Sequence, residues 1–294
     1  MLEQVPAKTI VTRVKDTSWF GLSYNMNIYR GCCHGCIYCD SRSDCYHVED
    51  FDRVRVKRDA LRIIRDDLRR KVKTGVVGTG AMSDPYNPFE KEEKLTRHAL
   101  ELLDAYGFGA AIATKSDLIV RDIDVLSDIA RHSPVLCKVT VTTCDDELAA
   151  KIEPRAPSPS ARLEAIRRLS GAGLFTGVLL MPVLPFLEDS DDSVLSLVER
   201  AADSGARFIY PAFGVTLRQN QRQYYFERLD ERFPGMKERY IARYGTRYSC
   251  VSPRAKQLWA LFTDRCREHG LLYKMQDIVS AYRQGYSTEQ LRLF

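Results

Sequence analysis

Short apolar segments rich in valine and isoleucine alternate along the chain with segments in which apolar residues recur every three or four positions. The first kind predicts strands buried on both faces, because no polar residue alternates with the apolar ones. The predicted strands are residues 23–29, 76–80, 109–114, 136–143, 176–183 and 206–213. The second kind predicts helices between them, with apolar stripes at Leu61, Ile64, Leu68 and Val72; Leu95, Ala99, Leu102 and Tyr106; Ile123, Leu126 and Ile129; Leu163, Ile166 and Leu169; and Val194, Leu197 and Ala201.

Strands that alternate with helices indicate β-α-β crossovers and a parallel α/β sheet. This pattern leaves two architectures, an open doubly wound sheet and a partial barrel, and both place functional residues beyond the carboxyl ends of the strands. Polar segments follow the first four predicted strands, at residues 29–40, 80–88, 115–117 and 143–146. We therefore expect these four segments to meet at one rim of the sheet.

The alternation stops near Val215, which divides the chain into two predicted regions. Residues 1–215 are expected to form the core, with an N-terminal arm at 1–17. Residues 216–294 are expected to form a helical C-terminal extension packed on that core, with Ser252 as a cap. Basic and aromatic residues are interleaved at 218–229, a pattern that suits nucleic-acid binding but is more typical of core packing. The basic cluster at 53–73 is interrupted by aspartates, so we expect a solvated helix face there.

Composition narrows the class of protein. The 294 residues are 45% hydrophobic and 28% charged, which is typical of a globular domain. No apolar run approaches the ~20 residues of a membrane span, and the polar N-terminus lacks the apolar stretch of a secretory signal. We therefore expect a cytoplasmic protein with reduced thiols. The net charge of +5 is explained by ordinary solubility, although it would also suit an anionic substrate such as nucleic acid.

Four of the nine cysteines lie in the segment "YRGCCHGCIYCD", residues 29–40. Cys32, Cys36 and Cys39 have the spacing C-x3-C-x2-C, and nearby glycines allow the backbone to wrap a metal centre. A zinc site would need a fourth ligand, for which His34 or His47 is available. An iron–sulfur cluster held by only three cysteines would leave one iron open for another ligand. Buried cysteines without a metal are the remaining alternative.

The segment "NIYRGCCHGCIYC", residues 27–39, closely resembles the cluster loop of radical S-adenosylmethionine enzymes, in the branch of spore photoproduct lyase and DNA repair photolyase-like proteins. The resemblance implies a partial (β/α)6 barrel in which Cys32, Cys36 and Cys39 hold a [4Fe-4S] cluster. It also implies that the reduced cluster cleaves S-adenosylmethionine to a 5′-deoxyadenosyl radical that abstracts hydrogen from a substrate. An electron donor of the flavodoxin or ferredoxin type is implied as well. Cys33 and Cys45 are expected not to be ligands of the cluster.

The resemblance continues through most of residues 18–215 and implies the contacts to S-adenosylmethionine. Tyr38 occupies the aromatic position beside the cofactor. Ser83 and Asp84 correspond to a pair that accepts from its amino group, although these residues also suit a turn. Lys115 corresponds to the lysine at its carboxylate, although a strand-ending lysine is often only solvated. Thr140, with Thr142 as the alternative in register, corresponds to a hydroxyl contact, although threonine is common in strands.

Residues 152–173 also match the resemblance, and three charged residues stand out there. Glu153 and Arg155 are expected either to bridge to the cofactor or to form a structural salt bridge. Arg162 is expected on the surface of a helix.

One position departs from the family pattern. Met82 stands where spore photoproduct lyase has a hydrogen-donating cysteine, and a thioether has no S–H to donate. This argues against repair of the thymine dimer. Alternative donors are Cys144, Cys250, Tyr210 and Tyr248.

The sequence thus predicts a radical S-adenosylmethionine enzyme whose substrate is unidentified, with nucleic acid as one candidate class. The same chemistry on RNA or a peptide is the first alternative. A non-catalytic zinc-binding scaffold is the second.

Overall fold

The computed structural model describes residues 2–286, and its main sheet holds six parallel strands with one antiparallel strand at the edge. In spatial order the strands are β10 (Phe208–Pro211), β9 (Thr176–Leu180), β8 (Val135–Thr140), β7 (Gly109–Thr114), β6 (Val76–Thr79), β3 (Tyr24–Met26) and the antiparallel β2 (Val11–Arg13). Each parallel strand overlaps one of the six predicted segments, so this part of the prediction is confirmed.

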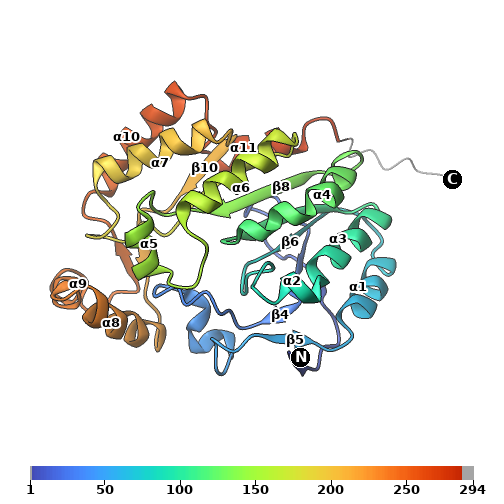
Figure 1. The fold of residues 1–294 in the computed structure, drawn as a ribbon, viewed down its shortest axis with the longest axis horizontal. Helices are drawn as coiled ribbons and strands as arrows, with labels where there is room; N and C mark the ends of the chain where they lie inside the picture. The colour runs from blue at the N-terminus through green and yellow to red at the C-terminus, as the bar shows by residue number, and fades with distance from the viewer. Residues whose placement is uncertain (1, 287–294) are drawn as a thin grey trace.

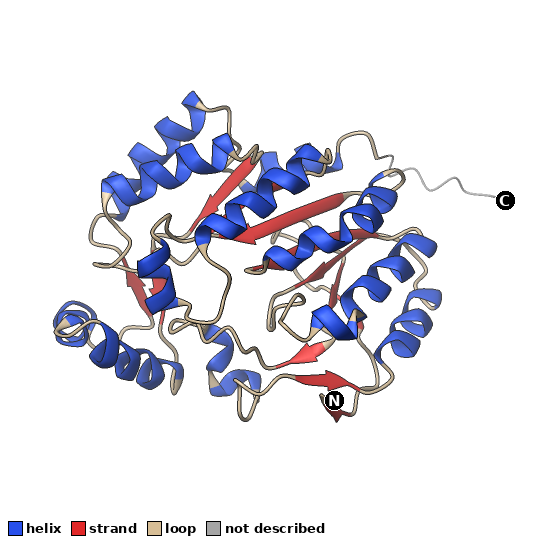
Figure 2. Cartoon of the chain, viewed as in Figure 1, coloured by secondary structure: helices blue, strands red, loops and turns tan. Residues whose placement is uncertain are grey.

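The order of the strands distinguishes between the two architectures left open by the sequence. From β3 to β10 the parallel strands follow one another in space as they do in the chain, whereas a doubly wound sheet reverses direction partway. Helices along the outer side follow the curve of the sheet (Figures 1 and 2). They are α1 (Ala60–Arg69), α3 (Leu95–Ala105), α4 (Ile123–Ala130), α6 (Pro159–Gly171) and α7 (Asp191–Asp203). The fold is therefore the predicted partial (β/α)6 barrel with helical segments after it.

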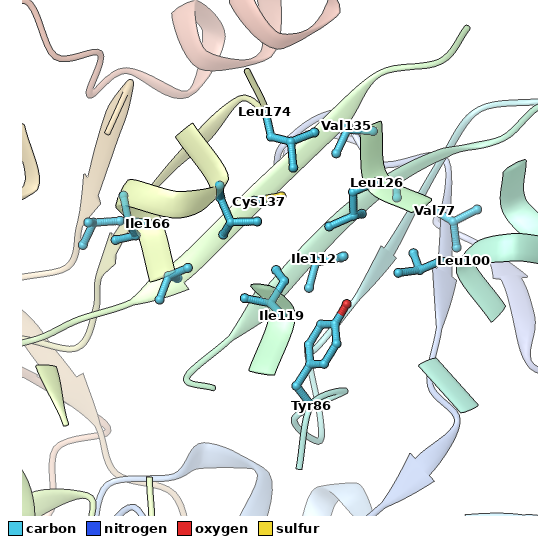
Figure 3. Packing of buried hydrophobic residues seen from close by; sticks show 14 of the residues in the cluster. Val77, Tyr86, Leu100, Ile112, Ile119, Leu126, Val135, Cys137, Ile166 and Leu174 are labelled. Atoms are coloured by element: carbon cyan, nitrogen blue, oxygen red, sulfur yellow. The ribbon is translucent and has the colours of Figure 1, made fainter. Parts of the chain in front are cut away.

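The two faces of the sheet are filled by different sets of side chains, because successive residues of a strand point to opposite sides. On the outer face, Ile112 and Cys137 pack with Leu126 and Ile166 from the helices (Figure 3). On the inner face, a smaller cluster forms around Leu136, Leu179 and Phe208, among other residues. The space that remains on the inner face lies toward the carboxyl ends of the strands.

The inner face is covered by two segments from opposite ends of the chain. Phe20 and Leu22 of the N-terminal arm share the inner cluster with Ile278 and Tyr282 of α11 (Met275–Arg283). The Tyr282 hydroxyl donates a hydrogen bond of 2.8 Å to the carbonyl of Phe20. The end of the chain thus helps to fill the interior of the barrel.

The remaining elements surround the rim of the barrel. A three-stranded sheet of β1 (Glu3–Val5), β5 (Arg55–Lys57) and β4 (Tyr29–Arg30) leads into the cysteine loop. β11 (Gly214–Thr216) pairs antiparallel with β12 (Ser249–Val251), and α10 packs on α7. The other helical segments are η1 (Asp40–Arg42), η2 (Asp44–Tyr46), α2 (Glu90–Glu93), η3 (Asp117–Asp122), α5 (Asp146–Ile152), α8 (Gln221–Arg232), α9 (Met236–Tyr244) and α10 (Ala255–Glu268).

Several local expectations can be compared with these elements. Val72 was expected in the first apolar stripe, but α1 ends at Arg69 and Val72 is 89% exposed. Asp67 was expected on a solvated face, yet it is buried and accepts from the backbone N–H groups of residues 10 and 11. Tyr225 packs in the core, as the preferred interpretation of residues 218–229 predicted. Ser252 lies three residues before α10 begins, and its hydroxyl accepts from the N–H of Arg254.

Within residues 2–286, no helix is both long and apolar enough to span a membrane.

Candidate active site at the carboxyl ends of the strands

The cysteine loop begins with a backbone geometry that only glycine tolerates. Gly31 has a φ of +81°, and a Cβ there would lie 2.6 Å from the carbonyl oxygen of Arg53 and 2.7 Å from that of Phe51. The next residue, Cys32, donates its N–H to the Phe51 carbonyl at 2.8 Å. The loop is therefore anchored to residues 51–53 immediately before the first ligand candidate.

A cavity of about 480 Å³ lies at the carboxyl ends of the strands, beside this loop. All eight residues that the sequence analysis named as cluster or cofactor contacts line it: Cys32, Cys36, Tyr38, Cys39, Ser83, Asp84, Lys115 and Thr140. They come from four segments spread over more than a hundred residues. Cys33 and Cys45 do not line the cavity, since Cys33 packs against the outer core and Cys45 is exposed at a separate surface hollow.

The three cavity cysteines are largely buried thiols. Burial raises the pKa of all three, and the pKa of Cys32 reaches about 12. The ammonium group of Lys115 acts in the opposite direction on Cys36 and Cys39. Thiols in such a setting ionise when a metal coordinates them. Among residues 2–286, no three His, Cys, Asp or Glu side chains are grouped tightly enough to hold a single metal ion.

Asp84 is the centre of a hydrogen-bonded group at the end of β6. It accepts from the hydroxyl of Thr114 at 2.6 Å, from the N–H of Lys115 at 2.7 Å and from the N–H of Tyr86 at 2.9 Å. His34 Nε2 lies 3.1 Å from Oδ2, the oxygen that also accepts from the N–H of Lys115. Burial raises the pKa of Asp84, but His34 and these hydrogen bonds outweigh it and lower the pKa to about 2. The carboxylate therefore ties the cysteine loop, β6 and β7 together.

Ser83 and Thr140 occupy different positions around the cavity. The hydroxyl of Ser83 donates to the carbonyl of Tyr29 at 3.1 Å, and both oxygen lone pairs of the hydroxyl remain available to accept. Thr140 is the last residue of β8 and lines the cavity directly. Thr142, the alternative in register, is buried but does not line the cavity.

Glu153 forms a second buried polar group beside the cavity. Its Oε2 lies 2.5 Å from Arg162 Nη2, its Oε1 accepts from the hydroxyl of Tyr38, and Lys115 Nζ lies 4.0 Å away. Arg162, expected on a helix surface, is in fact 1% exposed and also donates to the carbonyl of Thr140 at 2.9 Å. The surface prediction for Arg162 is wrong because helix α6 turns this residue toward a buried carboxylate. Glu153 was expected either to bridge to the cofactor or to form a structural salt bridge, and the structure shows the salt bridge with Arg162.

Arg155 forms hydrogen bonds with the cysteine loop but does not line the cavity. Its Nε donates to the carbonyl of Cys33, and its Nη2 lies 2.7 Å from Asp52. The backbone N–H of Arg155 donates to the carbonyl of His34 at 3.0 Å. Arg155 thus connects the loop to residues 50–52 and does not line the cavity.

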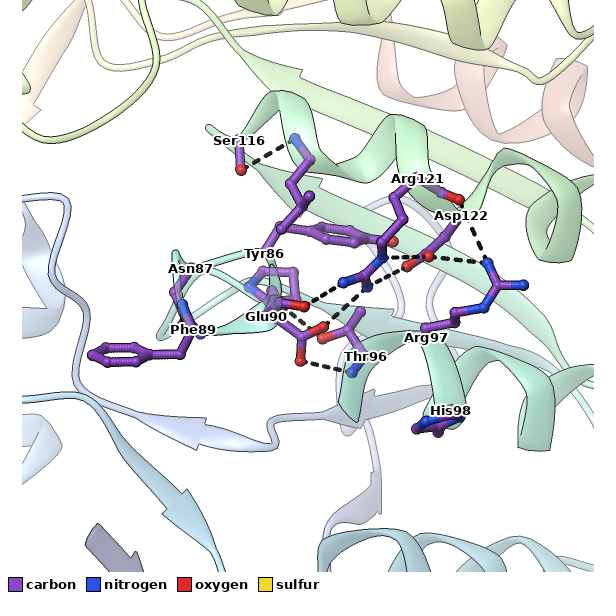
Figure 4. Close-up of polar contacts among 12 residues, drawn as sticks. Tyr86, Asn87, Phe89, Glu90, Thr96, Arg97, His98, Ser116, Arg121 and Asp122 are labelled. Carbon is purple, nitrogen blue, oxygen red and sulfur yellow. Dashed lines mark hydrogen bonds and ion pairs between the residues drawn. The ribbon is translucent and has the colours of Figure 1, made fainter. Parts of the chain in front are cut away.

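A second polar network lies among residues that follow the Ser83–Asp84 segment in the chain, around Glu90, Arg121 and Asp122 (Figure 4). Glu90 is fully buried, accepts from the N–H of Thr96 at 2.8 Å and lies 3.1 Å from Arg121. Arg121 also pairs with the buried Asp122 at 2.7 Å. Because each buried charge has a partner, this network can hold the segment in place without an uncompensated charge.

The candidate hydrogen donors lie in different places. Met82 lines the cavity, as its position in the sequence suggested. Tyr210 is next to the cavity wall, with its ring 5.5 Å from that of Trp19. Cys144 and Cys250 do not line the cavity, and Tyr248 lies at a separate surface hollow of about 1080 Å³.

Trp19 and Lys138 are among the cavity residues that the sequence analysis did not single out. Trp19 lies before the first strand and outside any motif. Lys138 was hidden in the apolar strand segment "LCKVTVTT", although a lone lysine at the centre of such a strand is itself a signal.

The profile of the Radical SAM superfamily matches residues 26–198, which include the cysteine loop and most of the barrel strands. The chain belongs to the radical SAM superfamily. Members of this superfamily use a [4Fe-4S] cluster and S-adenosylmethionine, so the predicted cofactors are those of the family. Three thiols that face one cavity, one of them buried and two half-buried, with a lysine and hydroxyl groups around them, fit such a cluster and an amino acid-bearing cofactor.

Relatives of this radical SAM protein include the uncharacterized protein Rv2578c of Mycobacterium tuberculosis, which is 32% identical over 248 residues, covering 82% of this chain and 73% of the relative. The uncharacterized protein MJ0683 of Methanocaldococcus jannaschii is also 32% identical, over 178 residues, covering 60% of this chain and 66% of the relative.

Solved structures share the fold at low identity. Spore photoproduct lyase complexed with dinucleoside spore photoproduct aligns with a TM-score of 0.65 at 16% identity, covering 91% of this chain and 80% of that one. The radical S-adenosylmethionine methyltransferase TsrM from Kitasatospora setae aligns with a TM-score of 0.57 at 11% identity, covering 90% and 59%. These similarities confirm the predicted partial barrel.

Proposed function

We propose that this protein is a radical SAM enzyme that abstracts hydrogen from a substrate held in the cavity. When both cofactors are bound, one electron from the reduced cluster breaks the S–C5′ bond of S-adenosylmethionine, giving methionine and a 5′-deoxyadenosyl radical that takes a hydrogen atom from the substrate. The observation that supports this proposal is the convergence of all eight expected contact residues on one cavity of about 480 Å³. Residues so far apart in the sequence have no local reason to meet there.

The roles of the individual residues follow from their chemistry. Cys32, Cys36 and Cys39 are the proposed ligands of the cluster, which leaves one iron for the cofactor. Lys115, a cation at the end of β7, is the proposed partner of the cofactor carboxylate. Its pKa is lowered by burial but raised above its ordinary value by Cys36 and Glu153, so it stays charged.

The amino group of the cofactor is an ammonium and needs acceptors. Ser83 offers the lone pairs of its hydroxyl. Asp84 already accepts three hydrogen bonds and contacts His34. It can therefore accept a further hydrogen bond from the ammonium group only if one of these contacts shifts. Thr140 offers another hydroxyl, and the ring of Tyr38 lies 5.5 Å from the Lys115 ammonium. These four assignments are proposals for mutagenesis.

Nucleic acid is the first substrate class to test. The basic net charge supports it, and so does the overall likeness to spore photoproduct lyase, whose solved complex contains a dinucleoside photoproduct. Met82 argues against thymine-dimer repair, because it supplies no S–H group. RNA and peptides are the alternative substrates. The electron donor, of flavodoxin or ferredoxin type, and the cytoplasmic location remain predictions.

The test is anaerobic reconstitution with iron and sulfide, followed by dithionite and S-adenosylmethionine with a label at C5′. We expect a brown protein with about four irons per chain, and formation of 5′-deoxyadenosine. DNA, RNA and peptide pools are then added separately. The pool that increases 5′-deoxyadenosine formation, or exchanges hydrogen with it, contains the substrate.

Matched cysteine variants serve as controls. Cys32→Ala, Cys36→Ala and Cys39→Ala should each lose the brown colour and all 5′-deoxyadenosine, whereas Cys33→Ala and Cys45→Ala should keep both. A colourless protein that binds zinc would contradict the proposal and support the scaffold alternative. Bleaching by Cys33→Ala would show that the ligand assignment is wrong.

A further inference from the structure

Lys138 is a lysine in the interior of the barrel without a polar partner. It lies in the middle of β8, is 2% exposed, and lines the same cavity as the three cysteines. Among residues 2–286, no carboxylate pairs with it and no side chain or backbone group forms a hydrogen bond with its ammonium group. Its nearest recorded contact is the face of the Phe20 ring, 4.8 Å from Nζ to the ring centre. A buried lysine without a partner is costly for the folded state.

The residues beside Lys138 on the two neighbouring strands are small, although the Phe208 ring covers one of them, Gly177. Lys138 is in register with Ala113 on β7 and with Gly177 on β9, so both of its neighbours on the sheet are small. Its own neighbours Cys137 and Val139 belong to the outer core, which confirms that Lys138 points to the inner face. The lysine therefore lies against the Phe20 ring on the inner face, where it lines the cavity.

The two lysines of the cavity lie in different surroundings. Lys115 follows β7 and has Glu153 4.0 Å from its ammonium group and Tyr38 beside it. Lys138 lies two residues before the end of β8, which places it about 6–7 Å further from the rim than Lys115. It is on the side of the N-terminal arm, where Trp19 also lines the cavity. The position is thus set back from the proposed cofactor contacts.

We propose that Lys138 is the substrate-binding cation of the cavity, and that the substrate presents to it one singly charged oxygen group, either a carboxylate or a phosphodiester. This inference rests on the proposed function, in which Lys115 is taken by the cofactor carboxylate. A single charge is inferred because Lys138 is the one further cation of the cavity lining, and His34 and Asp84 already face each other. The ion pair would form in a mostly apolar site, where it is stronger than in water.

The protonation of Lys138 gives the proposal a pH signature. Burial lowers its pKa to about 7, so the free site is charged below pH 7 and neutral above it. The anion binds the charged form, so affinity should fall about tenfold per pH unit above 7. The other titratable or charged groups that line the cavity or pack against it are His34, Tyr38, Asp40, Asp84, Lys115, Tyr210 and the three cysteines.

The experiment measures binding of small anions to the cluster-loaded protein, with S-adenosylhomocysteine present to occupy the cofactor site. Trp259→Phe removes the other tryptophan, so that Trp19 at the cavity reports binding by its fluorescence. The probes are acetate for a carboxylate, dimethyl phosphate for a phosphodiester, and acetamide as the neutral control. We expect at least one anion, but not acetamide, to bind, and the better anion identifies the substrate group.

Two variants of Lys138 separate a binding role from a structural one. Lys138→Met should weaken anion binding at pH 6.5 by roughly tenfold or more. It should also raise the unfolding midpoint at that pH, since it removes a buried unpaired charge. Lys138→Arg should keep binding and lose its dependence on pH between 6 and 9, because arginine stays protonated. Equal binding of acetamide, unchanged binding by Lys138→Met, or a lower midpoint in that variant would overturn the proposal.

The formation of 5′-deoxyadenosine without substrate distinguishes this inference from the function on which it rests. Lys138→Met should keep the KM for S-adenosylmethionine in that reaction, whereas Lys115→Met should raise it. If Lys138→Met raises this KM as much as Lys115→Met does, Lys138 belongs to the cofactor site and the inference fails while the function stands. If the unaltered protein forms no 5′-deoxyadenosine, the proposed function itself fails.

Discussion

Glu153 and Arg162 form an ion pair in the interior of the protein, with 2.5 Å between Oε2 and Nη2 and about 1% of each side chain exposed. Burial raises the pKa of Glu153, but Arg162 and Lys115 outweigh it and keep the carboxyl ionised. The pair also positions Tyr38 and the last residue of β8, Thr140, through hydrogen bonds. The framework behind the cavity therefore depends on a contact between helix α6 and the segment after α5.

Removal of Arg162 should destabilise the protein strongly. Arg162→Met leaves the Glu153 carboxylate buried without its main partner, which should reduce the free energy of unfolding by about 3–5 kcal/mol. Denaturant unfolding at pH 7 measures this. The control is Arg167→Met on the same helix, whose pair with Glu164 is largely exposed and should be worth less than ~1 kcal/mol. Similar losses in the two variants would contradict the structural role of the buried pair.

Asp84 should stabilise the protein at neutral pH and lose this effect in acid. Its pKa is about 2 in the folded protein and about 3.9 in an unfolded chain. The stabilisation is therefore complete above about pH 4 and disappears as the pH falls toward 2. Asp84→Asn should reduce the free energy of unfolding at pH 7 by roughly 2–3 kcal/mol, with a smaller difference at pH 3. Denaturant unfolding at both values measures this, and a difference that does not change with pH would contradict it.

Glu188 should show the opposite dependence. Burial raises the pKa of this carboxyl to about 8, and its Oε2 accepts from the N–H of Leu184 at 2.9 Å. Because the unfolded chain ionises near pH 4.3, the folded state loses stability as the pH rises from about 4 to 8. Glu188→Gln keeps an acceptor without the charge. It should match the unaltered protein at pH 4 and exceed its free energy of unfolding by a few kcal/mol, on the order of 3, at pH 8.

The comparison at two pH values contains its own control. A glutamine that simply packed better would raise the free energy of unfolding equally at both. A variant less stable than the unaltered protein at pH 8 would show that the ionised carboxylate is needed where it lies.

Gly80 marks a point where the backbone admits no side chain. It has a φ of +95°, and a Cβ there would lie 1.8 Å from the carbonyl oxygen of Ala113 on the neighbouring strand. Gly80→Ala should therefore cost on the order of 3 kcal/mol or more, by forcing β6 and β7 apart at the cavity. Thermal unfolding and cluster content measure the effect. Gly171→Ala is the matched control, because a Cβ at that position in α6 meets no atom within 4 Å, and it should change stability by no more than about 1 kcal/mol.

Much of the fold could be predicted because burial leaves a periodic trace in the sequence. All six parallel strands and the five main helices of the barrel fall on the predicted segments. The pattern was less informative at the helix ends. Val72 continues the apolar stripe of α1 but lies beyond its end, since a stripe records which residues would share a face and not where the helix stops.

The sequence by itself located the cysteine loop and, through its resemblance to radical SAM enzymes, indicated the family and its cofactors, because the three thiols and their glycines are neighbours in the chain. The rim positions of Lys115 and Thr140, which directly follow and end a strand, and of Ser83, which lies in the loop after β6, could also be predicted. The rule that parallel strands share one carboxyl edge then brings these positions together.

Only the tertiary structure decided which polar groups find partners. Arg162 could not be recognised as buried, because its partner Glu153 lies outside the helix that carries it. A lone lysine in an apolar strand was a signal, but whether Lys138 lines the cavity depends on neighbours from two other strands and on the Phe20 ring of the N-terminal arm. Periodicity reports that a residue is inside, whereas charge compensation depends on contacts between distant segments, which no local pattern encodes.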